Sequence, residues 1–348
     1  MLSEIKNLFK AFFFIIVMFL PIYLISPSKK AVEQDVIKKV NPEDFQVNTG
    51  MEGGTLHRAL AGDAKTFNPV MAQETTSTAV INPLFNGLTK TNVKTLLPEP
   101  DLAESWEVDK TGTKWIFHLR KNARWFDGKP VTADDVVFTY NEIYYNPNIP
   151  SSSKDILTVE GKKFIVKKID DYTVKFTIPK PFAPFLQAVG QPVLPKHILE
   201  KSVKDKTFTS TWGINTKPEK LIGTGPYKLK EYVIGQYAVY ERNPYYWERD
   251  KKGQKLPYIT KVKAQIIGDP DVRLIKFETG ETDYYGVRAS DLPELVPKAE
   301  KGKFTIYNLG ATPSTLFVVF NQNPHSPIPK YKLKWFQNTK FRQAISYA

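Results

Sequence analysis

The stretch KWIFHLRKNARWFDGKPVTADDVVFTYNEIY, residues 114–144, decides the fold of this chain. In its first part Trp115, Phe117 and Leu119 point to one side, while Lys114, His118 and Arg120 point to the other. This pattern predicts a strand with one buried face. Asp127–Gly128 then supplies a tight turn, because glycine takes a positive φ without steric cost. The stretch therefore begins as a strand that ends in a turn.

An amphipathic helix is predicted after the turn. Thr132 stands where an N-cap belongs, and Asp135 resembles the second member of a capping box. From Ala133 to Tyr144 the apolar residues recur at helical spacing. Asp134 and Asp135 could form an acid/base pair, but acidic residues in a first helical turn are favoured by the helix dipole and by capping. We interpret both carboxylates as structural.

The first thirty residues have the pattern of an export segment. Lys6 and Lys10 form a positive n-region, and residues 11–25 are almost uninterrupted apolar sequence. This run is shorter than the ~20 residues of a membrane-spanning helix and suits a secretory signal peptide at residues 1–30. No A-x-A-like cleavage site follows, so an uncleaved membrane anchor over residues 8–25 stays as the alternative.

Composition indicates a folded, exported protein. The chain has 348 residues with 41% hydrophobic content, enough for real cores. It contains no cysteine, which excludes disulfides, thiolate metal sites and a lipoprotein anchor. The net charge is +13, but the lysines are scattered, with no run longer than two. We therefore expect a solvated basic surface and no nucleic-acid partner.

Several motifs along the chain resemble those of the family 5 extracellular solute-binding proteins, which serve ABC importers. The 114–144 stretch resembles the family signature, through its leucine-arginine, tryptophan, Asp-Gly turn and PVTADDV. Further similar motifs, in the order expected, are GDAKTFNPV (62–70), PDLAESW (100–106), IGTGPYK (222–228) and FRQAISYA (341–348). The resemblance runs from about residue 53 to the last residue.

The resemblance implies an α/β fold of the periplasmic-binding-protein type (class II, cluster C), bilobal with an extra inserted domain. Residues 31–50 would be a linker. Lobe I would comprise residues 50–85 and 196–312, and a peripheral domain, residues 86–195, would be inserted in it. Residues 313–348 would begin lobe II, which is truncated, because relatives continue well beyond this point. We expect a fragment of a longer product, with a naturally truncated protein as the alternative.

The function implied is that of a monomeric receptor without chemistry or cofactor. It would capture oligopeptides outside the cytoplasmic membrane and deliver them to the permease subunits of an ABC importer. The positions that match a ligand-binding role are Gln73, Glu74 and Thr75, after the Asn-Pro turn, and Ser314, Thr315 and Phe317, at the opening of lobe II. An ordinary structural role for all six remains equally open.

Other functions remain open alternatives. The same fold could take nickel chelates or oligosaccharides, or serve as a membrane-tethered sensor or chaperone-like binder. A secreted hydrolase is disfavoured, because no nucleophile motif appears. The four histidines show no metal-ligand spacing, so we predict no metal site. Gly223–Gly225 lacks a phosphate-loop pattern and is interpreted as a structural turn. We also predict a helical turn at Asp101–Glu104 and a buried strand at Leu316–Asn321.

Overall fold

The computed structural model describes residues 36–39, 50–310 and 318–347, and these fall into two compact units. The larger unit runs from residue 50 to Pro297, and the smaller contains residues 36–39 and the described residues from Lys298 onward. Ser314, Thr315 and Phe317 lie outside the described residues, as does the segment predicted to direct export, residues 1–30.

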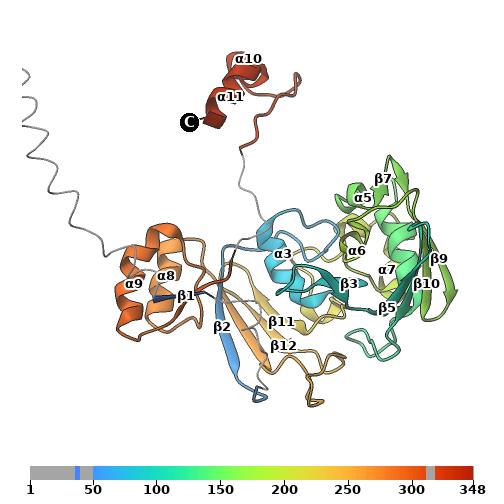
Figure 1. Ribbon diagram of the computed structural model, residues 1–348, viewed down its shortest axis with the longest axis horizontal. Helices are drawn as coiled ribbons and strands as arrows, with labels where there is room; N and C mark the ends of the chain where they lie inside the picture. Colours follow the sequence, from blue (N-terminus) through green and yellow to red (C-terminus); the bar gives the residue numbers. More distant parts are fainter. Residues whose placement is uncertain (1–35, 40–49, 311–317, 348) are drawn as a thin grey trace, which may run out of the picture. The chain divides into compact units, whose positions relative to one another are not determined.

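The first sheet of the larger unit joins the beginning of the described chain to much later segments. Its strand order is β11-β12-β13-β2. The strands are β2 (Thr55–Leu60), β11 (Tyr227–Val233), β12 (Tyr237–Arg242) and β13 (Lys261–Ile266). Strand β2 runs parallel to β13, with Leu56 opposite Val262, while β11, β12 and β13 are antiparallel. Figure 1 labels β2, β11 and β12 of this sheet, and β13 lies between β12 and β2.

The second sheet contains the opening of the 114–144 stretch. Its order is β5-β6-β10-β9, all antiparallel. The strands are β5 (Ala103–Val108), β6 (Lys114–Leu119), β9 (Ile165–Asp170) and β10 (Thr173–Thr177). Phe117 and Leu119 are buried and Trp115 is half-buried, as the alternation predicted. Two small ribbons accompany it, namely β3 (Thr89–Thr91) with β4 (Pro98–Pro100) and β7 (Thr158–Val159) with β8 (Lys162–Lys163).

One sequence prediction in this region is wrong. Asp101 and Leu102 form a bend, and β5 begins at Ala103, within the segment Asp101–Glu104 for which the sequence predicts a helical turn. Ala103 pairs with Leu119 of β6 and Trp106 with Phe117. Strand pairing therefore overrides the local helical preference of this segment.

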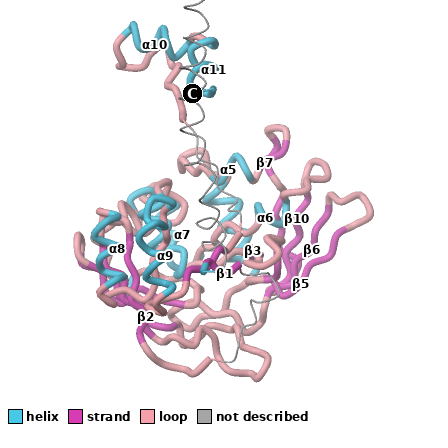
Figure 2. Tube along the Cα trace, turned by 60° about the vertical axis from the view of Figure 1, so that its left-hand side comes forward, coloured by secondary structure: helices cyan, strands magenta, loops and turns pink. Residues whose placement is uncertain are grey.

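The helices of the larger unit lie around the two sheets (Figures 1 and 2). The α-helices are α3 (Thr75–Ile81), α4 (Ala133–Phe138), α5 (Ser153–Ile156), α6 (Phe185–Ala188), α7 (Lys196–Lys204), α8 (Pro270–Glu278) and α9 (Leu292–Glu300), which begins in this unit. Short 3₁₀ turns are η2 (Asn82–Leu84), η4 (Phe208–Ser210), η5 (Pro218–Lys220) and η6 (Ala289–Asp291). Helix α4 continues as a π-helix, η3 (Thr139–Tyr144).

The predicted start of α4 is confirmed. The Thr132 N–H donates to Asp135 Oδ2 at 2.9 Å, as a capping box requires. Asp135 Oδ1 also accepts from the main-chain N–H of Lys196 at 2.9 Å, at the start of α7. The carboxylate therefore ties two helix starts together, and Asp134 forms an ion pair with Lys168. Both acidic residues have structural partners.

One continuous hydrophobic core unites the larger unit. Aromatic rings dominate its centre, where Phe117 meets Phe176 with ring centroids 5.4 Å apart and Tyr140 meets Phe176 at 5.0 Å. The same core includes Tyr240 and Val262 of the first sheet. Buried aromatic groups provide large apolar areas, so the two sheets share the main source of stability.

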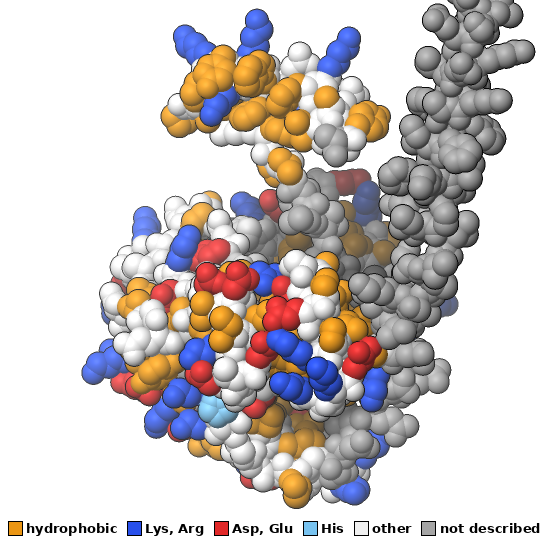
Figure 3. Space-filling model, turned by 90° about the vertical axis from the view of Figure 1, so that its left-hand side faces the viewer, with side chains coloured by type: hydrophobic (Ala, Val, Ile, Leu, Met, Phe, Trp, Pro, Cys, Tyr) orange, Lys and Arg blue, Asp and Glu red, His pale blue; other side chains and the backbone are white. Residues whose placement is uncertain are grey.

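The smaller unit contains a strand pair and a helix pair. Strand β1 (Ile37–Lys39) pairs in parallel with β14 (Ile306–Asn308), and α10 (Lys330–Gln337) is followed by α11 (Thr339–Tyr347). Neither helix buries any residue. In Figure 3 hydrophobic side chains crowd the surface of this helix pair, at the top of the view.

The predicted buried strand at Leu316–Asn321 is wrong for its described part. Residues 318–321 form no strand, and Val318 and Val319 are 71% and 75% exposed. Among the described residues no strand pairs with them, so their β-branched side chains gain no burial. Within the described part of the chain, no helix has the length and apolar character to span a membrane.

Candidate functional site: a polar cavity beside helix α3

The site begins with the turn that precedes α3. Asn68 is fully buried, and its Oδ1 accepts from the Val70 N–H at 3.0 Å. Its Nδ2 donates to the carbonyl of Phe208 at 3.1 Å. An asparagine in this position mimics a backbone turn, so the Asn-Pro motif fixes the direction in which the chain enters α3.

The three predicted ligand-binding residues of the larger unit stand at the start of α3. Gln73 and Thr75 are exposed and Glu74 is half-buried. The Ser77 hydroxyl donates to the Glu74 carboxylate, and this hydrogen bond lowers the pKa of Glu74. Ser77 Oγ also accepts from the Lys65 N–H at 2.8 Å. Glu74 therefore has a structural partner, while Gln73 and Thr75 present their side chains to solvent.

The segment Gly223–Gly225 lies directly against the 3₁₀ turn that extends α3. The Gly225 N–H donates to the Leu84 carbonyl at 2.9 Å. A Cβ added to Gly223 would lie 1.9 Å from that carbonyl oxygen, and one on Gly225 would lie 2.2 Å from the Pro83 oxygen. Only glycine permits such a close backbone approach. The prediction of a structural turn is confirmed, and the turn brings β11 to η2.

A cavity of about 550 Å³ opens beside α3 and η2. Its walls combine the loop before α3, the helix itself, residues 85–90, Ser152–Ser153, residues 190–192 and Tyr246. Gln73, Glu74 and Thr75 do not line this cavity, but their neighbours Ala72 and Thr78 do. This volume falls in the usual range for small-molecule sites, about 300–1,000 Å³.

Buried polar groups form one end of the cavity. Asn86 Nδ2 donates to both carboxylate oxygens of Asp101, at 3.0 and 2.8 Å. Thr224 Oγ1 donates to Asn86 Oδ1 at 3.2 Å. Burial raises the pKa of Asp101 to about 6, although the Asn86 hydrogen bonds and the charge of Lys90 oppose the rise. The cavity therefore holds a carboxyl group that changes charge near neutral pH.

An ion-pair chain continues from this end. Lys90 Nζ lies 2.9 Å from Glu248 Oε1, and the Tyr246 hydroxyl donates to Glu248 Oε2 at 2.9 Å. Burial lowers the pKa of Lys90, but the hydrogen bond and charge of Glu248 outweigh it and raise the pKa overall. Lys90 therefore stays protonated at neutral pH.

Sequence reasoning did not find these cavity residues. Asn86, Lys90, Asp101 and Tyr246 lie in separate motifs, and only folding brings them together. A usable signal was the single amide, Asn86, inside the otherwise apolar string LFNGL. Tyr246 and Trp247 are buried against each other, with ring centroids 4.6 Å apart.

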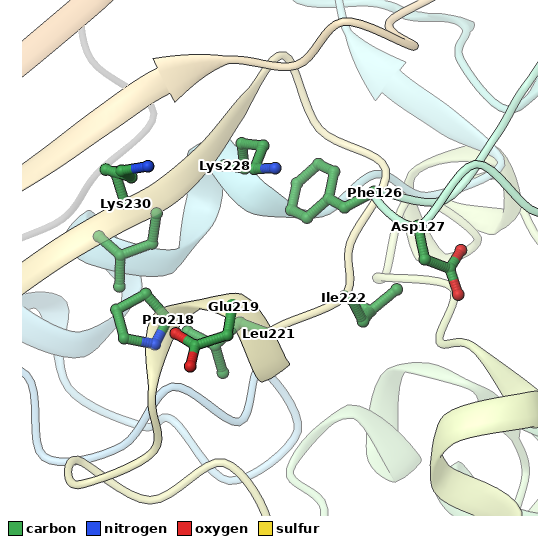
Figure 4. A pocket seen from close by; sticks show the side chains of 9 residues that line it. Phe126, Asp127, Pro218, Glu219, Leu221, Ile222, Lys228 and Lys230 are labelled. Carbon is green, nitrogen blue, oxygen red and sulfur yellow. The ribbon is translucent and has the colours of Figure 1, made fainter.

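A second pocket, of about 340 Å³, shares no lining residue with the first (Figure 4). Leu221 and Ile222 line the second pocket, whereas Pro226 lines the first. In Figure 4 Lys228 and Asp127 lie on opposite sides of the Phe126 ring. Asp127 Oδ2 lies 2.8 Å from His197 Nε2. This carboxylate therefore already has a partner.

The surface charge is mixed in sign. On the face in Figure 3, lysine and arginine side chains are interspersed with acidic ones. In the part of the chain that the structure describes, no group of three or more His, Asp or Glu side chains could hold a metal ion.

The two sheets and the helices around them form an α/β scaffold with a cavity beside α3. A sequence model of the bacterial extracellular solute-binding proteins, family 5, middle part, matches residues 98–348. The match covers well over half of the chain, and the protein belongs to this family. The fold class that the sequence motifs implied is confirmed.

Two curated relatives illustrate the family. A probable ABC transporter-binding protein of Deinococcus radiodurans is 31% identical over 306 residues, which are 84% of this chain and 50% of the relative. The periplasmic oligopeptide-binding protein OppA of Salmonella typhimurium is 31% identical, with 71% of this chain and 45% of OppA covered. This chain spans about half the length of these relatives.

Two solved structures show the same correspondence. The oligopeptide-binding protein AppA of Bacillus subtilis, in complex with a nonapeptide, is 29% identical with a TM-score of 0.59, over 73% of this chain and 47% of AppA. The periplasmic binding protein MelB of Agrobacterium fabrum, in complex with stachyose, has a TM-score of 0.71 over 89% of this chain and 49% of MelB. At 23% identity, MelB supports the fold alone.

Proposed function

We propose that this chain provides the first-lobe side of the substrate-binding receptor of an ABC importer, and that oligopeptides are its ligands. The observation that carries the proposal is the 550 Å³ cavity beside α3, with its buried polar end. The oligopeptide-binding relatives OppA and AppA support the peptide class. The receptor would act outside the cytoplasmic membrane as a monomer, without catalysis, and deliver its ligand to permease subunits.

Binding energy in such a receptor comes from polar main-chain contacts and from enclosure between lobes. We propose that Gln73 and Thr75 contribute the polar contacts, because both are exposed beside cavity residues. Ser314, Thr315 and Phe317 are proposed as contacts from the opening of the second lobe. Glu74 is proposed as a contact through its main chain, since its carboxylate already binds Ser77.

Thermal unfolding with candidate ligands tests the ligand class. A ligand that binds only the folded state at 100 times its dissociation constant stabilises it by about 2.7 kcal/mol. We expect a mixture of short peptides to raise the Tm, and stachyose and nickel-histidine to leave it unchanged. A Tm rise with stachyose or nickel-histidine alone would replace the peptide proposal with the corresponding alternative.

Point variants test the contact residues. Gln73→Ala and Thr75→Ala should weaken peptide binding severalfold without changing the Tm of the free protein, because neither side chain is buried. Gln254→Ala is the matched control, since Gln254 is also exposed and does not line the cavity. Equal peptide affinity in all three variants would remove Gln73 and Thr75 from the site.

The domain organisation is also a proposal. We propose an export leader or anchor at residues 1–30, a linker at 31–50, lobe I at 50–85 and 196–312, a peripheral domain at 86–195 and the opening of lobe II at 313–348. The intact mass of the protein from its host tests the first element. A mass lower by residues 1–30 would establish a cleaved leader, and an undiminished N-terminus would establish the anchor.

A further inference from the structure

We propose that the tip of the β3–β4 ribbon inserts into an anionic lipid surface. The tip is the set of three exposed aliphatic side chains in the turn between the two strands, Val93, Leu96 and Leu97. None of the three lines either pocket. The inference goes beyond the proposed function, because a receptor can bind peptides without touching lipid itself.

The first argument is the exposure of the tip. Val93 is 78% exposed, Leu97 64% and Leu96 49%. Three aliphatic side chains within one turn therefore stay in water, where each forgoes the free energy that burial would provide. Apolar residues scattered singly over a surface are ordinary, but a group of them marks a place that contacts another apolar phase.

The second argument is the backbone of Leu96. Its φ is +57°, in the left-handed region, which glycine adopts without steric cost. A leucine there is strained, and strain of this kind gathers at functional sites. The sequence has leucine where glycine would relieve the strain. The aliphatic side chain therefore brings a benefit that the stability of the turn alone does not explain.

The tip is held in one conformation by its own hydrogen bonds. The Asn92 N–H donates to the Leu97 carbonyl, and the Leu96 N–H donates to the Asn92 carbonyl, both at 2.8 Å. Asn92 Oδ1 accepts from the N–H groups of Lys94 and Thr95, at 2.9 and 3.0 Å. Because these backbone groups already have partners, the turn can enter an apolar phase without leaving them unsatisfied.

The composition of the turn favours lipid over a protein partner. Residues 91–97, TNVKTLL, contain one lysine, no acidic residue and no aromatic residue. Protein interfaces are enriched in aromatic residues and arginine and depleted in lysine. A lysine among aliphatic residues suits a lipid surface, because its alkyl stem can lie along apolar groups while its ammonium group reaches the headgroups.

A basic loop adjoins the base of the ribbon. Lys90 of β3 lies 2.9 Å from Glu248, and residues 249–255, RDKKGQK, follow Glu248 directly. This basic loop contains four cationic residues and one acidic residue, which gives it a net charge of +3. The ribbon and the basic loop therefore start from the same ion pair.

The charges of the basic loop are not balanced within it. The Asp250 carboxylate accepts from the N–H groups of Lys252 and Gln254, both at 2.8 Å, so it is committed to the backbone of the loop. Arg249 Nη1 donates to the neutral Gly253 carbonyl at 2.8 Å. Anionic headgroups would supply the missing negative charges. Each lysine or arginine beside an anionic membrane strengthens binding about fivefold, so the basic loop would attract such a surface.

A dye placed on the full chain measures lipid penetration. The sequence contains no cysteine, so Leu97→Cys carries an environment-sensitive nitrobenzoxadiazole dye at one position. Mixed phosphatidylglycerol–phosphatidylcholine vesicles should raise the dye emission severalfold, and lipids spin-labelled in the acyl chain should quench it. Vesicles of phosphatidylcholine alone should give a much weaker response. The dye reports only its own position, so lipid binding by residues 1–30 does not mimic the signal.

Ile234→Cys is the matched control for the dye position. Ile234 is also aliphatic, is 56% exposed and lies in the turn between β11 and β12. A dye at this position should not respond to either kind of vesicle.

Two sets of variants in the Leu97-labelled chain test the causes. Leu96→Gly should weaken binding to the mixed vesicles about tenfold, yet keep or raise the Tm, because glycine relieves the left-handed strain. The pair Lys251→Gln and Lys252→Gln should weaken binding about tenfold or more. The pair Lys217→Gln and Lys220→Gln removes the same charge from other exposed lysines. It should change binding by less than about twofold, since charges that do not face the lipid are screened by salt.

Several outcomes would overturn the inference. These are a dye at Leu97 that does not respond to the mixed vesicles, an equal response at Ile234, or an equal response to phosphatidylcholine alone. A signal that rises with protein concentration in the absence of lipid would assign the tip to a second copy of this chain instead. An equal loss in both lysine pairs would remove the basic loop from the lipid surface. Leu96→Gly should retain the Tm rise with peptides, so a failure of lipid binding leaves the proposed function standing.

Discussion

Replacing Gly223 with alanine should strongly destabilise the larger unit. The added Cβ would lie 1.9 Å from the Leu84 carbonyl oxygen and 3.2 Å from Phe126 Cε2. The contact between the Gly223–Gly225 segment and η2 is made by backbone atoms, so neither side can move aside by changing a rotamer. The substitution must separate two segments that carry the polar end of the cavity.

The expected cost follows from two contributions. Overpacking in a close-packed region costs about 1–3 kcal/mol. Separation of the segments also lengthens the 2.9 Å hydrogen bond from Gly225 to Leu84, and such a bond contributes about 0.5–1.5 kcal/mol. The sum is roughly 2–4 kcal/mol, which corresponds to a Tm decrease of roughly 5–15 °C for a domain of this size.

Thermal unfolding followed by circular dichroism measures this effect. Gly286→Ala is the matched control, because its added Cβ meets nothing within 4 Å and its backbone is not in the left-handed region. The control should change the free energy of unfolding by less than about 1 kcal/mol, in either direction. If Gly223→Ala unfolds at the same temperature as Gly286→Ala, the argument that this motif is a packing device is refuted.

Three further predictions follow from the buried polar groups. Asp135→Ala should lower the free energy of unfolding by roughly 3 kcal/mol or more, because the N–H groups of Thr132 and Lys196 lose their acceptor. The control Asp134→Ala should leave the urea midpoint nearly unchanged. Equal urea midpoints for the two variants would contradict the capping argument. Ser77→Ala should lower the Tm, because the Lys65 N–H loses its 2.8 Å partner, whereas the exposed Thr75→Ala should not. Because the pKa of Asp101 is raised to about 6, folding favours its protonated form. The contribution of this carboxyl group to stability is therefore complete below about pH 4 and is lost as the pH rises through about 6. That loss of stability is of the order of 3 kcal/mol. The free energies of unfolding of the wild type and Asp101→Asn, measured by urea titration across this pH range, should converge at low pH. Parallel pH profiles for the two proteins would show that Asp101 is not the titrating group.

Local sequence patterns predicted the elements whose structure depends on neighbouring residues. The alternation in Lys114–Leu119 and the cap at Thr132 act within one turn or one strand, and both are present in the structure. The family motifs predicted the fold class, because their order along the chain reflects the order of its elements. These features did not require knowledge of tertiary contacts.

The cavity could not be predicted in the same way. Thr224 reaches Asn86 because Gly223–Gly225 packs against η2. Asp101 reaches Asn86 because its main chain bonds to Leu88. The helical prediction for Asp101–Glu104 was wrong for the same reason, because Ala103 and the residues that follow it pair with β6 in the sheet. The segment Gln73–Thr75 adjoins the cavity residue Ala72, but none of its own residues lines the cavity.

The parallel pairing of β2 with β13 sets the order in which this protein can acquire its structure. Strand β2 is at the edge of its sheet, and β13 is its neighbour there. The ribosome synthesises β2 long before β13, so β2 has no neighbouring strand to pair with until β13 has been made. Contacts between distant residues slow folding, and unpaired strands persist during that delay. The edge of this sheet is therefore completed only after β13 has been made.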